Sequence, residues 1–391
     1  MQYRSFQGLT LSRLGMGNMR LPTTADGQVD LEKARAILEY AYQHGVNYFD
    51  TAYSYHGGQS EPVVGEILKQ FPRDTWYLAT KMPGHEINPN FQPKPIFAEQ
   101  LRRCQVDYFD FYLLHNVYDK SVEVYSDESL GIIPFLQEQK KEGTIRHFGF
   151  STHASLDVLR RFLDRYDGVF EFVQMQLNYL DWTLQNAEAT YALLRERNLP
   201  VIVMEPCRGG KLAKLPEDAE QKLRAFRPDD SDASWAFRWL QEKEGVQIVL
   251  SGMSTMEQIR ENVRTFSEEK PLTEEERACL EGITGEMLKN LIPCTACRYC
   301  CKSCPQELNI PRLISLYSDF VLGNTLTSSM LVDSLPEDKQ PQACIGCGNC
   351  RQVCPQGIDV PDIMKKFAEL LRGIPHWTEI SKERAKLHVY E

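Results

Sequence analysis

The stretch Gly45-Val-Asn-Tyr-Phe-Asp50-Thr-Ala-Tyr-Ser-Tyr55-His-Gly-Gly58 reads as a short buried strand that ends in an acid, with a phenol on the loop that follows. Its apolar residues are of the kind that fill buried strands. Two later segments, Tyr77–Lys81 and Phe109–His115, follow the same plan, because each is an apolar run that closes on one ionisable residue. Three successive strands of this kind would present their ionisable residues at one rim of a sheet or barrel.

The strand ends and the loop bring together four groups with a shared chemical logic, namely Asp50, Tyr55, Lys81 and His115. A phenol is a poor proton donor near neutral pH, because its reference pKa is about 10. A neighbouring ammonium stabilises the phenolate, and a carboxylate behind the ammonium holds it in place and keeps it protonated. Tyr55 would then protonate a carbonyl oxygen as hydride reaches the carbon, while His115 orients the same oxygen. One lysine or histidine alone at a strand end is more often structural, so the prediction depends on all four together.

Strands and helices alternate from residue 14 onward, which is the signature of parallel βα units. The expected strands span residues 14–20, 46–49, 77–81, 109–115, 145–151, 170–176, 201–204 and 247–250. The expected helices span residues 31–44, 61–70, 96–105, 129–141, 155–166, 186–197, 233–243 and 256–266. Right-handed crossovers would close eight such units into a (β/α)8 TIM barrel, and a hairpin over residues 3–14 would plug its bottom.

The chain of 391 residues exceeds a single typical domain, since a barrel of this type takes about 250 residues. Its net charge of −10 argues against binding to nucleic acid or to an anionic membrane, because both need a basic face. No apolar run is long enough to span a bilayer, and the first residues lack a secretory signal. We therefore expect a cytoplasmic α/β protein with neither a nucleic-acid nor a membrane partner.

In order and in local context, Asp50, Tyr55, Lys81 and His115 resemble the Asp, Tyr, Lys, His tetrad of the aldo-keto reductases. The contexts that match are Gly-Val-Asn-Tyr-Phe-Asp-Thr-Ala around the acid and Leu-Leu-His at the histidine. The resemblance covers roughly residues 1–270. It implies an NAD(P)-linked oxidoreductase that reduces a small aldehyde or ketone by hydride transfer, with Tyr55 as the general acid.

The resemblance also implies residues that bind the nicotinamide. Ser151 and Gln174 match the family members' ligands of its carboxamide, although Thr152 replaces the asparagine that many members have next to the serine. Met204 stands where many members stack a tyrosine on the nicotinamide ring. A thioether is a polarisable but weaker surface, so a different flat ring, such as that of FMN, is an alternative occupant.

Two further segments resemble the parts of the family that hold phosphate groups. Pro206, Gly209 and Gly210 lie in a glycine-rich loop after the seventh strand, where backbone N–H groups would approach a pyrophosphate. The segment after the eighth strand matches the adenosine-phosphate grip at three positions, Ser254, Gln258 and Asn262. The Lys and Arg that many members aim at a 2′-phosphate are absent, so NADP and NAD both remain open.

Nine of the twelve cysteines lie beyond residue 290, where the spacing C-x2-C-x2-C-x3-C-P occurs twice, fifty residues apart. In a reducing compartment this pattern indicates metal rather than disulfides. The spacing is the bacterial ferredoxin ligand run, in which three cysteines hold one 4Fe-4S cluster and the fourth crosses to the other cluster. The alternative is a pair of zinc sites, which usually come as two separated cysteine pairs. The predicted ligands are Cys294, Cys297, Cys300 and Cys354 for one cluster and Cys304, Cys344, Cys347 and Cys350 for the other, with Cys301 spare.

We therefore expect a barrel over residues 1–270, a linker helix over 271–290 that leads away from it, and a mostly helical di-cluster ferredoxin-like domain with a C-terminal tail over 291–391. The 39 residues between the two cysteine runs resemble the spacer of the α-helical ferredoxin domains of respiratory and anaerobic enzymes. The combination looks like the iron–sulfur aldo-keto reductases of anaerobic bacteria.

Hydride carries two electrons, whereas each cluster carries one, so a flavin would have to divide the pair, or the clusters serve a redox partner protein or only stabilise the tail. A second hypothesis is therefore a redox-sensing or electron-delivering protein whose barrel holds a cofactor without fast turnover. A third and weaker one is a radical or dehydration enzyme that uses the clusters directly on its substrate. The sequence does not identify the carbonyl substrate.

Overall fold

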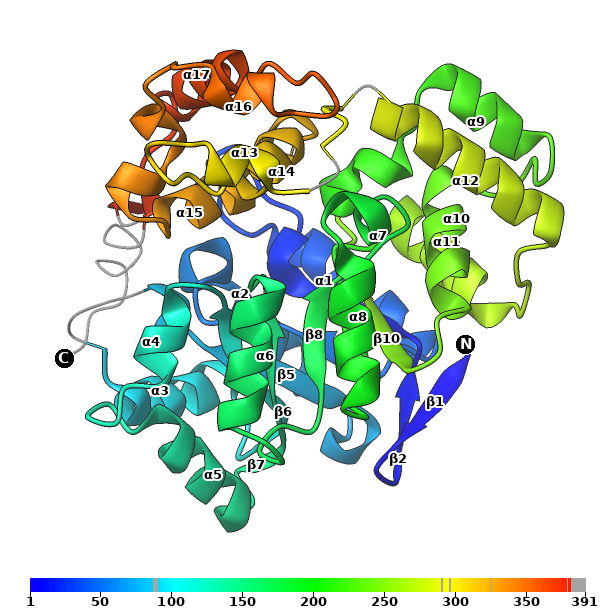
Figure 1. Cartoon of the computed structure of the whole chain (residues 1–391). Helices are drawn as coiled ribbons and strands as arrows, with labels where there is room; N and C mark the ends of the chain where they lie inside the picture. Colours follow the sequence, from blue (N-terminus) through cyan, green and yellow to red (C-terminus); the bar gives the residue numbers. More distant parts are fainter. Residues whose placement is uncertain (87–90, 290, 295–296, 324, 378, 381–391) are drawn as a thin grey trace.

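The computed structural model of the chain describes residues 1–86, 91–289, 291–294, 297–323, 325–377 and 379–380. Its N-terminal part is a closed barrel of eight parallel strands in the order β10-β3-β4-β5-β6-β7-β8-β9 (Figure 1). This arrangement confirms the predicted (β/α)8 TIM barrel. The barrel strands are β3 (Leu14–Gly17), β4 (Tyr48–Asp50), β5 (Tyr77–Met82), β6 (Phe109–Val117), β7 (Ile145–Thr152), β8 (Val173–Gln176), β9 (Val201–Met204) and β10 (Val246–Ser251).

The eight predicted helices are all present, and their ends differ from the prediction by three residues or fewer. They are α1 (Leu31–Gln43), α2 (Ser60–Leu68), α3 (Pro93–Cys104), α5 (Ile132–Glu142), α6 (Leu156–Arg165), α8 (Ala187–Glu196), α10 (Asp232–Gln241) and α11 (Met256–Ser267). Three shorter helices lie in loops, α4 (Ser121–Tyr125), α7 (Asp181–Leu184) and α9 (Glu217–Arg224). Strand β3 is shorter than predicted, because the Asn18 side chain bonds the backbone oxygens of Met16 and Asp50 and the chain turns there.

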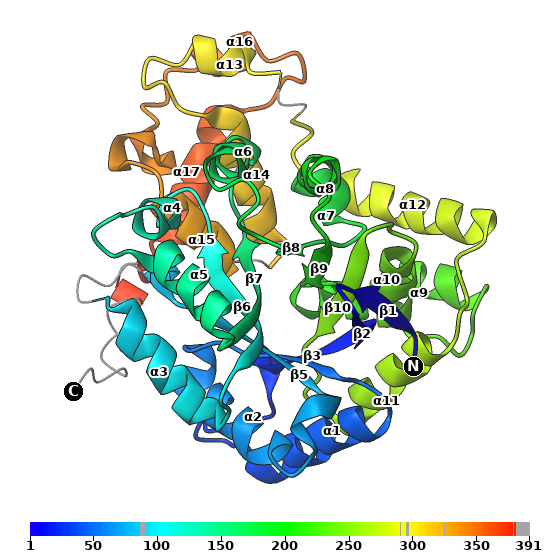
Figure 2. The same cartoon turned by 90° about the horizontal axis from the view of Figure 1, so that it is seen from below.

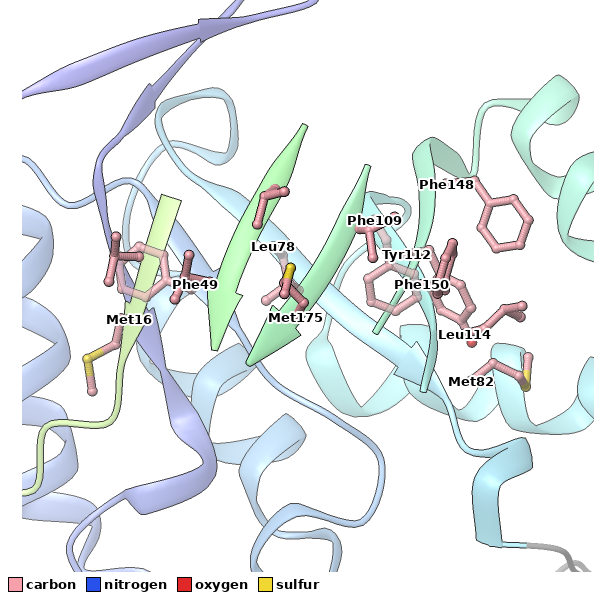
Figure 3. Close-up of a cluster of buried hydrophobic side chains, with 14 of the residues drawn as sticks. Met16, Phe49, Leu78, Met82, Phe109, Tyr112, Leu114, Phe148, Phe150 and Met175 are labelled. Atoms are coloured by element: carbon pink, nitrogen blue, oxygen red, sulfur yellow. The ribbon is translucent and has the colours of Figure 1, made fainter. Parts of the chain in front are cut away.

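Strand β6 shows how the sequence fills both sides of the barrel wall. Phe111 and Leu113 belong to the inner cluster, which the barrel encloses. Tyr112 and Leu114 belong to the large cluster between the strands and the surrounding helices (Figure 3). Alternate residues of a strand face opposite sides, so a strand buried on both faces must be apolar along most of its length. This requirement is the physical reason why apolar runs predict the barrel strands well.

A hairpin closes the end of the barrel where the strands begin. Strands β1 (Tyr3–Phe6) and β2 (Leu9–Ser12) pair antiparallel, and Phe6 belongs to the inner cluster. The backbone nitrogen of Ser12 donates a hydrogen bond of 2.8 Å to Asn47 Oδ1, just before β4. The carboxyl ends of the strands therefore remain as the end at which a site can form.

Helix α12 (Glu274–Lys289) packs along α9 and α10 instead of leading away from the barrel, so that expectation is wrong. Its side chains Leu280 and Ile283 share a buried cluster with Trp235 of α10. An ion pair joins Arg227 Nε to Glu276 Oε1 at 2.6 Å. The helix stays on the barrel because its apolar face finds a partner there. The predicted domain limits at residues 270 and 290 stay predictions.

The second part of the chain is helical and contains two matching halves. In each half a short helix, α13 (Tyr299–Lys302) or α16 (Asn349–Gln352), is followed by a long one with a proline in its first turn, α14 (Ile310–Val321) or α17 (Val360–Leu371). Figure 2 shows α13 and α16 side by side at the end remote from the barrel. Helix α15 (Thr325–Asp333) also belongs to this second part and lies on the side that faces the barrel. Among the described helices, none combines the length and the apolar character that crossing a bilayer requires.

Candidate active site and cluster sites

The predicted acid, ammonium and phenol meet at the carboxyl ends of two neighbouring strands. Asp50 ends β4, and Lys81 lies near the end of β5, which pairs with β4. The Nζ atom of Lys81 lies 2.6 Å from Asp50 Oδ1 and donates a second hydrogen bond of 2.7 Å to the carbonyl oxygen of Thr51. It donates a third, of 3.4 Å, to the phenolic oxygen of Tyr55. The ammonium is thus held between a carboxylate and the phenol.

Burial determines the proton affinities in this group. It raises the pKa of Tyr55 above the ordinary value, and the Lys81 ammonium, which acts in the opposite direction, offsets only part of the rise. Burial lowers the pKa of Lys81, but Asp50 and Tyr55 more than compensate, so the pKa of Lys81 is raised overall. Lys81 therefore keeps its charge, as the sequence predicts. The phenol differs from the prediction, because its loss of hydration outweighs the ammonium and leaves it harder to ionise than an ordinary phenol.

The imidazole of His115 completes the group from β6. It stands edge-on to the Tyr55 ring, with the ring centroids 5.7 Å apart. Asp50, Tyr55 and His115 line a cavity of about 580 Å³ at the carboxyl ends of the strands, and Lys81 lies behind it. The structure thus brings the four predicted catalytic residues together, and their catalytic roles stay predictions.

The same cavity is lined by the nine residues predicted to bind the cofactor, Ser151, Gln174, Met204, Pro206, Gly209, Gly210, Ser254, Gln258 and Asn262. One of these residues, Gln174, has an oxygen atom that could accept a hydrogen bond from the carboxamide of a nicotinamide. The buried side-chain oxygen of Gln174 has no hydrogen-bond partner among the described residues, while its nitrogen lies 3.7 Å from Met204 Sδ. A buried acceptor left unpaired costs free energy, so this oxygen suits a ligand that donates a hydrogen bond, such as a carboxamide.

The loop after β9 allows close approach of its backbone to a ligand. Gly209 and Gly210 have φ of 65° and 102°, in the left-handed region that glycine tolerates. Backbone N–H groups in such turns form a concave site for anions. The guanidinium of Arg20 lies beside them, since a Cβ on Gly209 would be 3.5 Å from Arg20 Nη2. Arg20 is the one Lys or Arg among the described residues that line the cavity.

The three predicted residues of the adenosine grip also make contacts within the protein. The Gln258 side chain accepts a hydrogen bond of 2.7 Å from the backbone nitrogen of Ser254 and forms a capping box with Thr255 at the start of α11. Asn262 Nδ2 donates a hydrogen bond of 3.1 Å to Ser251 Oγ. These side chains shape the start of the helix that borders the cavity, and their contact with a phosphate stays a prediction.

Among the ionisable residues of the cavity that sequence reasoning missed are Arg20 and Glu205. The side chain of Glu205 is buried, and burial, with Asp181 in addition, raises its pKa to about 7. An available signal was the position of each residue just after an apolar strand segment, which is the criterion that identified Asp50 and His115. Neither residue belongs to the predicted group of Asp50, Tyr55, Lys81 and His115.

The eight predicted cluster ligands divide between two small cavities. One cavity is lined by Cys294, Cys297, Cys300 and Cys354. The other is lined by Cys304, Cys344, Cys347 and Cys350. In each set three cysteines come from one run and the fourth from the other run, which matches the crossed assignment. Cys301 lines neither cavity.

The shape of these sites bears on the choice between iron–sulfur clusters and zinc. Within the described ranges, no three His, Cys, Asp or Glu side chains converge closely enough to hold a single metal ion. The cysteines instead surround cavities with apolar walls, for example Ile310 and Met364 in one and Ile314 in the other. A polynuclear cluster fits this arrangement better than a tetrahedral zinc ion.

A closed barrel with ionisable groups at its carboxyl ends has the architecture of the (β/α)8 enzymes. Residues 13–284 match the aldo/keto reductase family, and residues 293–358 match the 4Fe-4S dicluster domain. The chain belongs to the aldo/keto reductase family and carries a C-terminal 4Fe-4S dicluster domain. The resemblance seen in the sequence is thereby confirmed.

The individual relatives described here each cover between 66% and 72% of the chain. The oxidoreductase YqkF of Bacillus subtilis is 28% identical over 308 residues, which cover 71% of this chain and 94% of that protein. The NADH-specific methylglyoxal reductase of Escherichia coli is 27% identical over 305 residues, covering 66% and 91% of the two chains. Among solved structures, the holo form of an aldo-keto reductase from Bacillus halodurans is 30% identical, with a TM-score of 0.59 over 72% of this chain and 96% of that chain.

Proposed function

We propose that this oxidoreductase reduces an aldehyde or ketone with hydride from NADP or NAD in their reduced forms, with Tyr55 as the acid. The observation that carries the proposal is the shared cavity, which is lined by Tyr55, by Gln174 and by the glycine loop after β9. The phenolic oxygen of Tyr55 lies 3.4 Å from Lys81 Nζ. A reduced nicotinamide bound there supplies the hydride to the carbonyl carbon. The name of the Escherichia coli relative, an NADH-specific methylglyoxal reductase, supports a carbonyl substrate.

The residues of the chain itself handle the oxygen and the proton. Tyr55 donates its phenolic proton to the carbonyl oxygen as negative charge develops there, and Lys81 stabilises the phenolate that remains. His115 donates a hydrogen bond to the same oxygen and orients the carbonyl group. Asp50 holds Lys81 in place through the 2.6 Å ion pair. Solvent returns a proton to Tyr55 after the alcohol leaves.

Substitution Tyr55→Phe should lower kcat for carbonyl reduction by about a hundredfold or more, because the proton donor is removed. Binding of NADPH and NADH, measured by titration calorimetry, should stay close to that of the wild type. Tyr53→Phe is the matched control, since Tyr53 lies on the same loop, is buried, and does not line the cavity. An unchanged rate in Tyr55→Phe would contradict the acid role.

We also propose that the two cysteine-lined cavities hold two 4Fe-4S clusters, with the crossed ligand sets given above. Cysteine thiols that are to bind iron stay reduced in the cytoplasm, which supports the cytoplasm as the proposed location. A second function, delivery of electrons to a redox partner protein, is favoured by one observation. Cys297 and Cys347 are exposed, so one corner of each cluster would lie near the surface.

Anaerobic purification followed by cofactor extraction distinguishes coupled from separate use of the clusters. A bound flavin such as FMN beside Met204, together with clusters that NAD(P)H reduces, would support electron flow between the barrel and the clusters. Absence of flavin, with clusters that stay oxidised when NAD(P)H and a carbonyl compound are added, would reject coupled flow within the chain and leave the partner or a structural role.

A further inference from the structure

The dicluster part of the chain reaches over the mouth of the barrel cavity. Leu326, Thr327 and Met330 of α15, together with Trp377, line the same cavity as the predicted catalytic residues. Met330 and Trp377 are 4% and 6% exposed, so both are buried between the two parts of the chain. Apart from Thr327, the side chains that this part contributes to the cavity are apolar.

Contacts to both parts of the chain hold Met330 and Trp377 in position. Asn116 of β6, next to the predicted catalytic histidine, places its Nδ2 atom 3.3 Å from Met330 Sδ. The backbone nitrogen of Trp377 donates a hydrogen bond of 2.6 Å to Asp333 Oδ2 at the end of α15. Its indole nitrogen approaches the backbone oxygen of His85 at 3.5 Å. The two side chains are thus fixed relative to the barrel.

A row of rings connects Trp377 to the predicted acid. The ring centroids of Tyr55 and His115 are 5.7 Å apart, those of His115 and His85 are 4.0 Å apart, and those of His85 and Trp377 are 5.9 Å apart. His85 is buried between the other rings. The indole is therefore separated from the phenol of Tyr55 by two imidazole rings.

We propose that the dicluster domain forms one wall of the substrate site, and that this wall selects carbonyl compounds with an aromatic group. The inference rests on the proposed function, because it concerns the substrate of the same site. An aromatic group beside Trp377 gains ring–ring contact, and the thioether of Met330 adds a favourable sulfur–aromatic contact. Among the described residues that line the cavity, Arg20 is the one Lys or Arg and lies beside Gly209, so the apolar wall offers neither a lysine nor an arginine to a carboxylate.

The test compares Met330→Ala and Trp377→Ala in the full-length, cluster-loaded protein, with Leu331→Ala as the matched control. Leu331 is the next residue on α15 and is 7% exposed, but it packs in the core of the dicluster part and does not line the cavity. KM is measured for benzaldehyde and for propanal with the preferred nicotinamide. Binding of benzamide, an unreactive aromatic amide, is measured by calorimetry in the presence of oxidised nicotinamide.

Trp377→Ala should raise KM for benzaldehyde and weaken benzamide binding by about fivefold to tenfold, since an aromatic contact is lost. KM for propanal should change by less than about twofold, and Trp377→Phe should restore most of the benzaldehyde KM. Leu331→Ala should leave both values close to the wild type, with iron content unchanged in all variants.

Equal changes for benzaldehyde and propanal, or the same change in Leu331→Ala, would overturn the selective wall. If the wild type reduces no carbonyl compound, the proposed function fails, and benzamide binding then decides the inference separately. Weaker benzamide binding in Trp377→Ala would support the wall, and unchanged binding would overturn it.

Discussion

At the barrel mouth, burial and charged neighbours shift the pKa of the same side chain in opposite directions, as Lys81 and Tyr55 show. The Lys81 ammonium, with no exposed surface, is kept charged by Asp50 at 2.6 Å. Burial raises the pKa of Tyr55 in spite of that ammonium. The predicted tetrad could be found from the sequence because each member ends a strand or follows one. Glu205 follows β9 in the same way, but its raised pKa, which comes from burial with Asp181 in addition, is not visible in the local sequence.

A pH dependence of stability is expected from Glu61, a buried carboxyl that accepts hydrogen bonds from Thr80 Oγ1 at 2.6 Å and from Gln100 Nε2 at 2.7 Å. Burial raises its pKa from 4.5 to about 7. The native state therefore binds more protons than the unfolded state between these two pH values, so the free energy of unfolding falls as the pH rises through this window.

Glu61→Gln should remove about 2 kcal/mol of this fall, which urea unfolding at about pH 5 and about pH 8 would measure. Glu66→Gln, on the exposed face of the same helix, should leave the pH dependence as it is in the wild type. If Glu61→Gln and the wild type lose the same amount of stability between the two pH values, Glu61 is not the source of the pH dependence.

Among the elements, the loop after β9 and helix α14 are joined by one buried arginine. Arg208, with a side chain 1% exposed, places Nε 2.8 Å from Asp181 Oδ1 and pairs through Nη2 with Asp319 of α14. The next residue is Gly209, which lines the cofactor cavity. The strands and helices around this loop follow from local apolar periodicity. The ion pair between Arg208 and Asp319 does not follow from that periodicity, because the two residues are 111 positions apart in the sequence. The local sequence of α14 does not indicate which part of the barrel the helix contacts.

Asp319→Asn should lower the free energy of unfolding by about 2 kcal/mol, since Arg208 loses one charge-assisted hydrogen bond and keeps its ion pair with Asp181. NADPH binding should weaken as well, because the loop that carries Gly209 loses its anchor. Thermal unfolding and NADPH titration measure the two effects. Glu220→Gln removes an exposed pair with Arg224 and should change stability by less than about 0.5 kcal/mol. Equal melting temperatures for the two variants would contradict the anchoring role.

At the scale of the whole molecule, two domains share one cavity and two cysteine runs share two cluster sites. The division of the cysteines between two cavities was predictable, because in runs with this spacing the fourth cysteine binds the cluster of the other run. The contact between α15 and the barrel mouth was not, since nothing in the local sequence of Met330 or Trp377 marks them as part of a cavity built mostly from residues before 270. Helix α12 was misplaced for a related reason, because its partner surface lies on α9 and α10.

Cys354→Ser should remove one cluster and lower the iron content from about eight to about four atoms per chain, because its partners in the cavity come from the first run. Cys301→Ser should keep both clusters, since Cys301 lines neither cavity. Iron analysis and Mössbauer spectroscopy on anaerobically reconstituted protein measure this. Equal iron loss in both variants, or full iron content in Cys354→Ser, would contradict the assignment of Cys354 as a ligand and of Cys301 as the spare cysteine.

The central claim is that hydride passes directly from the nicotinamide to a carbonyl carbon held at Tyr55. It is tested by following deuterium from NADPH or NADH that carries two deuterium atoms at the nicotinamide C4 position. The alcohol made by the wild type should contain one deuterium at the former carbonyl carbon, and Tyr55→Phe should form almost none of this product. Alcohol that forms without deuterium at that carbon would contradict direct transfer in the barrel.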